Sequence, residues 1–296
     1  MTHVLPCVPG SALGIVANPM SGRDIRRLVA RASVFPNAEK INMVLRLIEA
    51  AGALGVETVH LSTDTMGVAA GVLRESGRRT ASTPSSATRW PKLEFSEPGA
   101  LHGTAADTRA HVRAMADRGV AAFVVLGGDG TVRAASPALD GVPVLPLSTG
   151  TNNAFPEMWE ATVAGTAAAL IATGRVGVED GTYRAKSLTV TAAGRTEVAL
   201  VDVCVNTAMH VGSRALWEVA TLRELYCTFG EPHAIGLSSI AGQARPTARR
   251  DPRGVRIVLD VGARRRVLAP IAPGVLAPIG IAGVGELEPE IGRAHV

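Results

Sequence analysis

The sequence has 296 residues, of which 47% are hydrophobic and 19% charged, so it is not a disordered chain and is long enough for one large domain or two ordinary ones. The net charge of +4 suits an anionic ligand and is too small to indicate nucleic-acid binding. The three cysteines lack metal-type spacing, and neither a signal peptide nor a long apolar stretch is found, so we expect a cytoplasmic protein that does not contact membranes.

The first half of the sequence alternates short apolar runs with helical patterns. Thr104 is a predicted helix N-cap, with Asp107 three residues later. The apolar run 121–126 is typical of a parallel strand that is buried on both faces. This alternation predicts an α/β domain over residues 1–174, with a parallel sheet and helices on both of its faces. In chain order we expect a strand at 13–18, helices at 24–33 and 38–54, a strand at 56–61, a helix at 67–75, a long loop at 76–103 with a strand near 93–95, a helix at 104–118, strands at 121–126 and 142–147 around a helix at 132–139, and a helix at 157–173.

The pattern changes near residue 175. Short strand-like runs separated by turn residues predict a second, mainly β domain over residues 175–296. The expected strands lie at 187–192, 197–206, 254–261 and 266–269, with a helix around 213–225.

A glycine-rich loop, Gly127-Gly128-Asp129-Gly130-Thr131, follows the buried run 121–126. Glycines let backbone amides approach a phosphate group and permit positive φ angles, so Gly127, Gly128, Gly130 and Thr131 are candidate phosphate contacts. A carboxylate repels phosphate, which suggests that Asp129 either orients magnesium or accepts a proton from an attacking hydroxyl. The alternative is a tight turn in which Asp129 caps the next helix.

Two further polar segments follow predicted strands. Asn18-Pro19-Met20-Ser21-Gly22 comes after the first strand, and Ser148-Thr149-Gly150-Thr151-Asn152-Asn153 comes after the run 142–147. Ligands of open α/β sheets bind beyond the carboxyl ends of strands, so we expect these segments and the glycine loop to line one cleft. Each segment alone could be a turn or a helix cap. The candidate nucleotide contacts are Asn18, Ser21, Gly22, Thr149, Gly150, Thr151, Asn152 and Asn153.

The three motifs in this order resemble the superfamily of NAD kinases, diacylglycerol kinases and sphingosine kinases. The segments Asp107–Thr131, Leu147–Pro156 and Val211–Trp217 are most similar to the branch of ATP-NAD kinase-like proteins named for acetoin catabolism protein X. The resemblance covers about residues 13–285 and implies a Rossmann-like domain followed by a β domain. It also implies Mg²⁺-dependent phosphoryl transfer from ATP to a hydroxyl, which in NAD kinases is the adenosine ribose 2′-hydroxyl of NAD, giving NADP. Asp129 would then activate the hydroxyl.

The sequence departs from the NAD kinases in two ways. It has no equivalent of their Thr-Pro-Thr-Gly-Ser-Thr-Ala-Tyr stretch, and Asn206-Thr207 is at best a loose counterpart of their Asn-Glu pair. Relatives also usually continue into a strand ending in Asp-Gly-Glu, whereas this sequence ends at Val296, so we expect a truncated or altered C-terminus. Two alternatives to an NAD kinase therefore stay open: a lipid or polyol kinase of the diacylglycerol kinase type, and a catalytically weak nucleotide sensor. Relatives form dimers or tetramers, so a homo-oligomer is a further expectation.

Overall fold

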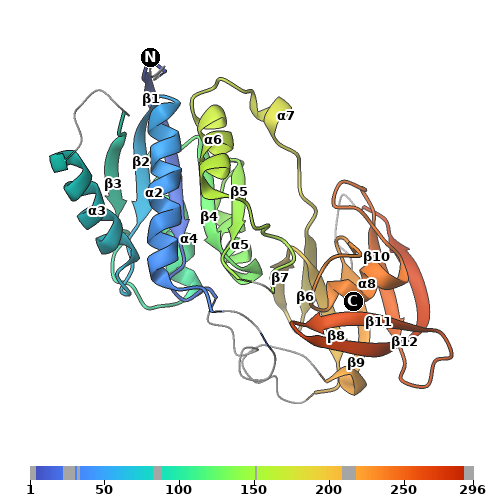
Figure 1. The fold of residues 1–296 in the computed structure, drawn as a ribbon. Coiled ribbons are helices and arrows are strands. Elements are labelled where there is room, and N and C mark those ends of the chain that lie inside the picture. Colours follow the sequence, from blue (N-terminus) through green and yellow to red (C-terminus); the bar gives the residue numbers. More distant parts are fainter. Residues whose placement is uncertain are drawn as a thin grey trace. The chain divides into compact units, whose positions relative to one another are not determined.

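The computed structural model describes residues 5–22, 31, 34–82, 89–150, 152–208 and 218–289. The chain divides into two compact units, each described here by itself (Figure 1). The first unit comprises residues 1–22, 34–150 and 156–182, and the second comprises 23–33, 151–155 and 183–296. The predicted helix at 24–33, Thr151 and the motif at 211–217 lie outside the described residues, apart from Arg31.

The sheet of the first unit has five parallel strands in the order β3-β2-β1-β4-β5. The chain builds one half of the sheet outward from β1 and then returns to place β4 on the other side of β1. The pair β1–β4 is therefore the point at which the strand order reverses, where open α/β sheets bind ligands. The strands are β1 (Val8–Ala17), β2 (Val56–Ser62), β3 (Lys92–Ser96), β4 (Ala122–Gly127) and β5 (Val144–Ser148).

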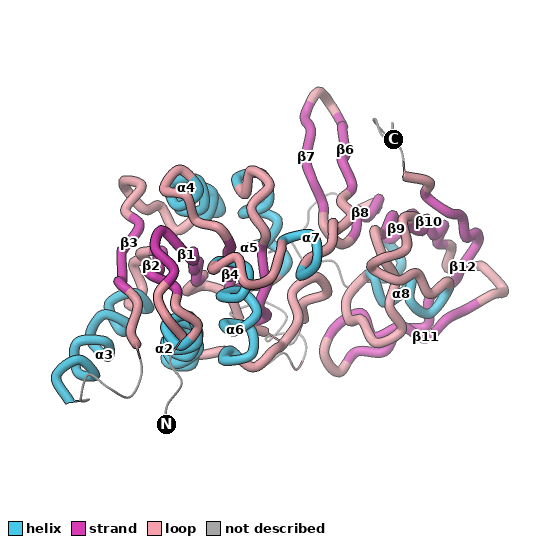
Figure 2. Tube along the Cα trace, turned by 90° about the horizontal axis from the view of Figure 1, so that it is seen from above, coloured by secondary structure: helices cyan, strands magenta, loops and turns pink. Residues whose placement is uncertain are grey.

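Helices cover both faces of this sheet. Seen from above, α2, α3 and α6 lie on one face and α4 and α5 on the other (Figure 2). The helices are α2 (Asn37–Ala53), α3 (Val68–Ser82), α4 (Ala105–Ala116), α5 (Asp129–Ala135) with the short 3₁₀ turn η1 (Ser136–Ala138), α6 (Ala161–Ala172) and α7 (Val178–Gly181). Within the described residues, every helix is too short or too polar to span a bilayer.

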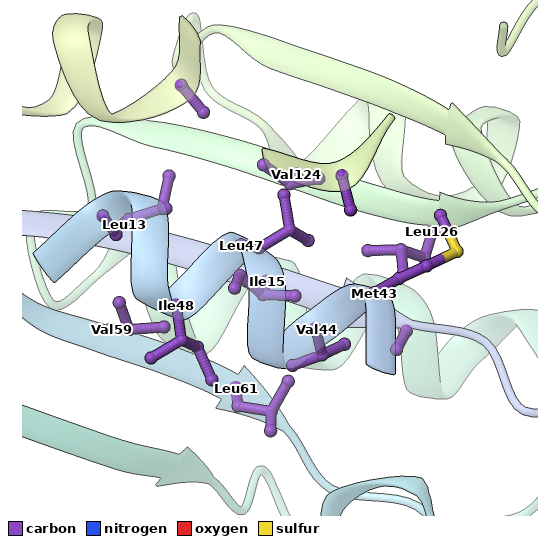
Figure 3. Packing of buried hydrophobic residues seen from close by; sticks show 14 of the residues in the cluster. Leu13, Ile15, Met43, Val44, Leu47, Ile48, Val59, Leu61, Val124 and Leu126 are labelled. Carbon is purple, nitrogen blue, oxygen red and sulfur yellow. The ribbon is translucent and has the colours of Figure 1, made fainter. Parts of the chain in front are cut away.

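The core of the first unit lies between α2 and the sheet (Figure 3). Leu47 and Ile48 of α2 pack against Leu13 and Ile15 of β1 and Val124 of β4, and all five side chains are fully buried. Burial of each large aliphatic side chain stabilises the fold by about 2 kcal/mol. This packing fixes the carboxyl ends of β1 and β4 against the start of α2.

The structure confirms the parallel sheet and corrects some element boundaries. Thr104 and Asp107 form the predicted capping box at the start of α4. The helix predicted at 67–75 continues to Ser82, into the stretch predicted as a loop, and the strand expected near 93–95 is β3. The helix predicted at 132–139 begins instead at Asp129, because Gly128 supplies the extended N-cap conformation.

The second unit contains an antiparallel sheet in the order β11-β12-β10-β9-β8 and a separate hairpin of β6 and β7. Helix α8 (Ser238–Ala244) packs against this sheet. Ile240 of α8 is fully buried with Leu225 and Ile257 in the second core. The strands are β6 (Leu188–Ala192), β7 (Arg195–Ala199), β8 (Asp202–Asn206), β9 (Leu222–Cys227), β10 (Gly254–Leu259), β11 (Arg266–Ala272) and β12 (Val275–Leu287), with the 3₁₀ turn η3 (Val219–Thr221) before β9. The predicted mainly β second region is thus confirmed.

Two predictions in this unit were wrong in detail, and one strand was missed. The run 197–206 is two strands, β7 and β8, separated at Leu200 and Val201. The helix expected around 213–225 is wrong over its described part, since Leu222–Cys227 is strand β9, paired with both β8 and β10. The long strand β12 was not predicted at all.

Candidate functional site

Three polar segments of the first unit meet at the carboxyl ends of β1, β4 and β5. These strands are adjacent and parallel, so the residues that follow them lie along one edge of the sheet. The backbone N–H of Asn18 donates to the carbonyl of Leu126 at 3.0 Å, and that of Thr149 donates to the carbonyl of Gly127 at 3.3 Å. The predicted proximity of the motifs is therefore observed within this unit.

Side chains connect the three segments directly. Asn18 Nδ2 donates a hydrogen bond to Thr131 Oγ1 at 2.8 Å, and Thr149 Oγ1 donates to Ser21 Oγ at 2.7 Å. Ser21 Oγ donates in turn to the carbonyl of Asn18 at 2.7 Å. We call Asn18, Ser21, Thr131 and Thr149 the strand-end cluster. The amide and hydroxyl groups of the cluster fix each other's orientation, which pre-organises polar groups at the switch point.

The glycines at this edge of the sheet differ in whether the structure has room for a side chain at their position. A Cβ on Gly22, which has φ +73°, would lie 2.6 Å from Phe35 Cβ and 2.7 Å from the carbonyl oxygen of Thr149. A Cβ on Gly127 would overlap the Thr131 side chain. A Cβ on the exposed Gly130 would meet no atom within 4 Å, and Gly130 is not among the described glycines with positive φ. Packing thus explains glycine at positions 22 and 127 but not at position 130.

Asp129 is the first residue of α5 and is half-buried. The helix N-cap is Gly128, with φ −101° and ψ −176°, so Asp129 is not the cap that the alternative interpretation required. Asp129 precedes Thr131, a member of the strand-end cluster, by two positions at the start of α5. The loop itself is shorter than the sequence predicted, since only Gly128 separates β4 from α5.

The remaining predicted site residues belong to two different environments. Gly150 follows the cluster in the first unit, where its carbonyl accepts a hydrogen bond from Ser148 Oγ at 2.8 Å. Asn152 is buried and Asn153 half-buried, and both belong to the second unit. The residues that follow them are fixed there by Arg249, whose guanidinium donates to the carbonyls of Ala154 at 2.5 Å and Phe155 at 2.8 Å.

Sequence reasoning missed Lys40 in the first turn of α2. Its side chain has no exposed surface, and Nζ donates to the carbonyl oxygens of Pro19 at 2.9 Å and Ser21 at 2.8 Å, within the first polar segment. A signal was present, because Lys40 precedes Met43, Val44 and Leu47 by three, four and seven residues and so lies on the apolar face of the helix.

The described residues contain no group of three or more His, Cys, Asp and Glu side chains that could hold a metal ion. Magnesium is commonly bound by one or two carboxylates together with substrate phosphates. Asp129 is one half-buried carboxylate, so a Mg²⁺ ion here would arrive with a nucleotide and be held mainly by the phosphates of that nucleotide.

A parallel sheet with this order, a glycine-rich turn after β4 and a separate β unit together define a Rossmann-like domain followed by a mainly β region. Residues 13–176 match the family model of the ATP-NAD kinase N-terminal domain, and residues 186–293 match that of the acetoin catabolism protein X C-terminal domain. The chain is 41% identical to acetoin catabolism protein X of Cupriavidus necator over 290 residues, which is 96% of this chain and 79% of that protein. The chain belongs to the acetoin catabolism protein X family, with an ATP-NAD kinase N-terminal domain, as its motifs predicted.

Proposed function

We propose that this protein is an ATP-dependent kinase that transfers the terminal phosphoryl group of ATP to a hydroxyl of a small molecule. The site would comprise the strand-end cluster, the glycine loop and Asp129. The kinase-type fold of the first unit supports a nucleotide substrate. NAD is the first acceptor to test, with its 2′-hydroxyl as the reacting group.

The observation that carries the proposal is the strand-end cluster, one member of which, Thr131, lies in the helix that begins with Asp129. Asn18, Ser21, Thr131 and Thr149 come from three segments up to 131 positions apart (from 18 to 149) and are joined by hydrogen bonds at the reversal point of the sheet. A kinase needs polar donors that hold phosphate oxygens and a carboxylate that can accept a proton from the acceptor. Gly130 adds support, because an exposed helix position that has room for a side chain nevertheless carries glycine.

The proposed reaction needs one base. A bond forms between the acceptor oxygen and the terminal phosphorus while the bond from that phosphorus to the bridging oxygen breaks, so ADP leaves. Asp129 takes the proton of the attacking hydroxyl. Mg²⁺ bound with the triphosphate would neutralise charge on its oxygens.

The family match of the second unit influences which acceptor molecules should be tested. It matches a C-terminal domain model named for acetoin catabolism protein X. The NAD-kinase stretch Thr-Pro-Thr-Gly-Ser-Thr-Ala-Tyr has no equivalent in the sequence. The acceptor panel should therefore include acetoin, a small hydroxyketone, and diacylglycerol beside NAD. Cytoplasmic location and homo-oligomer formation stay predictions.

The experiment is mass spectrometry of products after incubation of the chain with ATP, Mg²⁺ and this panel. With the preferred acceptor, Asp129→Asn should bind ATP like the wild type and lose at least about 100-fold in turnover. Undiminished turnover in Asp129→Asn would remove the proposed base. ATP binding without product from any acceptor would favour a nucleotide sensor instead.

Gly130→Ala is the matched control for the phosphate site. Alanine is a better helix former than glycine, so the free energy of unfolding of this variant should be equal to that of the wild type or higher by up to about 1 kcal/mol. Urea denaturation measures this difference. If phosphate oxygens approach this turn closely, the added methyl group should weaken ATP binding nonetheless. Tight ATP binding by Gly130→Ala would argue against phosphate contact here.

A further inference from the structure

Lys40 is a buried lysine that donates hydrogen bonds to the loop Asn18–Gly22 and to Asn37. The side chain has no exposed surface, and its ammonium donates to three oxygens. Two are backbone carbonyls of the loop Asn18–Gly22, those of Pro19 and Ser21, and the third is Asn37 Oδ1 at 3.1 Å. Removing an ammonium group from water is costly, so a lysine in such a place is retained for what its three donors hold.

These contacts set the direction of the loop amides. In a trans peptide the C=O and the following N–H point in opposite directions. Because the carbonyl of Ser21 is directed at Lys40 Nζ, the N–H of Gly22 points away from the lysine. The same loop supplies Asn18 and Ser21 to the strand-end cluster, through Thr131 and Thr149. The position of Lys40 Nζ is therefore linked to that of both side chains by a short stretch of backbone whose Pro19 and Ser21 carbonyls are held by the ammonium.

We propose that Lys40 is a positioning residue for the nucleotide phosphates: its ammonium holds the Asn18–Gly22 loop so that the side-chain amide of Asn18 and the backbone amide of Gly22 are set for anionic oxygens. This inference rests on the proposed function, because it assigns the phosphates to the strand-end cluster. The three hydrogen bonds of Lys40 described above all go to protein oxygens, so its effect on the phosphates is exerted through the loop.

The test compares Lys40→Met, which keeps the length of the side chain and removes the donors, with Lys92→Met. Lys92 lies on β3, its side chain is 69% exposed, and it pairs with Glu94. Lys40→Met should raise the KM for ATP by about 10- to 100-fold, with the KM for the acceptor and the kcat changed much less. Lys92→Met should leave all three unchanged. Wild-type ATP affinity in a folded Lys40→Met protein would overturn the proposal.

Chemical rescue separates positioning from general stability. Lys40→Ala lacks a three-carbon chain and an ammonium group, which n-propylammonium can restore, whereas tetramethylammonium cannot donate hydrogen bonds. ATP affinity should recover with n-propylammonium only. Lys40→Arg should not recover it, because a planar guanidinium cannot direct donors to three oxygens around one point. Equal effects of both ammonium ions would contradict a role for the donors, and a Lys40→Met protein that fails to fold leaves this experiment decisive.

The NMR amide resonance of Gly22 tests the positioning role of Lys40 in the absence of nucleotide. In Lys40→Met it should shift strongly in the NMR spectrum, while amides of β2 stay in place; an unmoved Gly22 amide would refute the positioning role. Inorganic triphosphate serves as the binding probe. If the wild type binds neither ATP nor triphosphate, the proposed function fails. If the wild type and Lys40→Met bind them equally well, the inference about Lys40 fails alone.

Discussion

Two backbone segments of this chain are held by cationic side chains, the fully buried Lys40 and the half-buried Arg249, which work differently. In the first unit Lys40 holds the loop Asn18–Gly22 through carbonyl oxygens and the amide of Asn37. In the second unit Arg249 holds Ala154 and Phe155 through their carbonyls while it pairs with the carboxylate of Glu231, at 2.9 and 3.1 Å. The guanidinium also stacks on the ring of Phe229, 4.5 Å from its centroid.

The difference lies in what each segment contributes to its own packing. Ala154 and Phe155 pack into a small apolar cluster with Val201 and Phe229, so side chains and the guanidinium act together. The loop Asn18–Gly22 has an exposed Met20 and a glycine at its turn, so hydrogen bonds to the backbone do most of the work. A converging ammonium suits such a loop, and a planar fork suits a segment with a carboxylate beside it.

The largest effect on stability should come from Gly22→Ala. The added Cβ meets a backbone oxygen and Phe35 at under 3 Å, and φ is +73°, so we expect a loss of about 3 kcal/mol in the free energy of unfolding. Gly67→Ala is the control, since Gly67 has φ +84° with no atom within 4 Å of its Cβ, and it should lose only about 1 kcal/mol. Urea denaturation of both variants measures the difference in the free energy of unfolding. Equal losses in the two variants would mean that the backbone around residue 22 moves to make room for the methyl group.

Arg249→Lys should have the next largest effect. Lysine keeps the charge and loses the fork, so the two carbonyls and Glu231 cannot all be satisfied, at a cost of about 2 kcal/mol. Arg250→Lys is the control, because Arg250 is exposed and stacks on Tyr183. Hydrogen exchange in β9 and α8 together with urea denaturation would measure the loss. An unaffected Arg249→Lys would show that the charge alone anchors the segment.

Much of the first unit could be predicted, because its signals are local. Continuous apolar runs such as 121–126 become strands that are buried on both faces, and Thr104 and Asp107 mark a helix start without any tertiary information. The burial of Lys40 was missed since a lysine normally predicts a solvent-exposed helix face. The one indication of its burial is the helical spacing that places Lys40 on the same face of α2 as Met43, Val44 and Leu47.

The second unit was harder to predict because tertiary contacts override its local signals. Pro278 and several glycines lie within the sequence of β12 and are unfavourable in strands, so the sequence does not predict a strand there. In the structure β12 is continuous, and Pro278 pairs with Leu268 of β11. Gly280 is required because a Cβ would overlap the carbonyl oxygen of Asp260. A basic stretch such as 245–256 is typical of a solvated loop, yet Arg249 within it contacts Glu231 and residues 154–155, which are distant in sequence.

The smallest expected effect is a response to mild acid in the first unit, where two histidines are buried. Burial lowers the pKa of His60 from 6.5; Glu94 opposes this, and Arg118 and Lys92 add to it. Burial likewise lowers the pKa of His111, against Asp107, the Thr63 backbone and Asp64. The unfolded chain therefore takes up these protons first as the pH falls below 6.5. Stability is complete above that pH and is lost progressively down to the folded-state pKa values.

A double variant, His60→Gln with His111→Gln, should remove this pH dependence in the window below pH 6.5 and above about 4, where carboxyl groups titrate. Denaturation midpoints of wild type and variant across this window measure the effect. His233→Gln is the control in the second unit, since that side chain is 81% exposed. Neither histidine belongs to the strand-end cluster, so ATP binding should persist in this window while the first unit becomes easier to unfold. A wild type whose unfolding is independent of pH in this window would mean that water reaches both imidazoles in the folded chain.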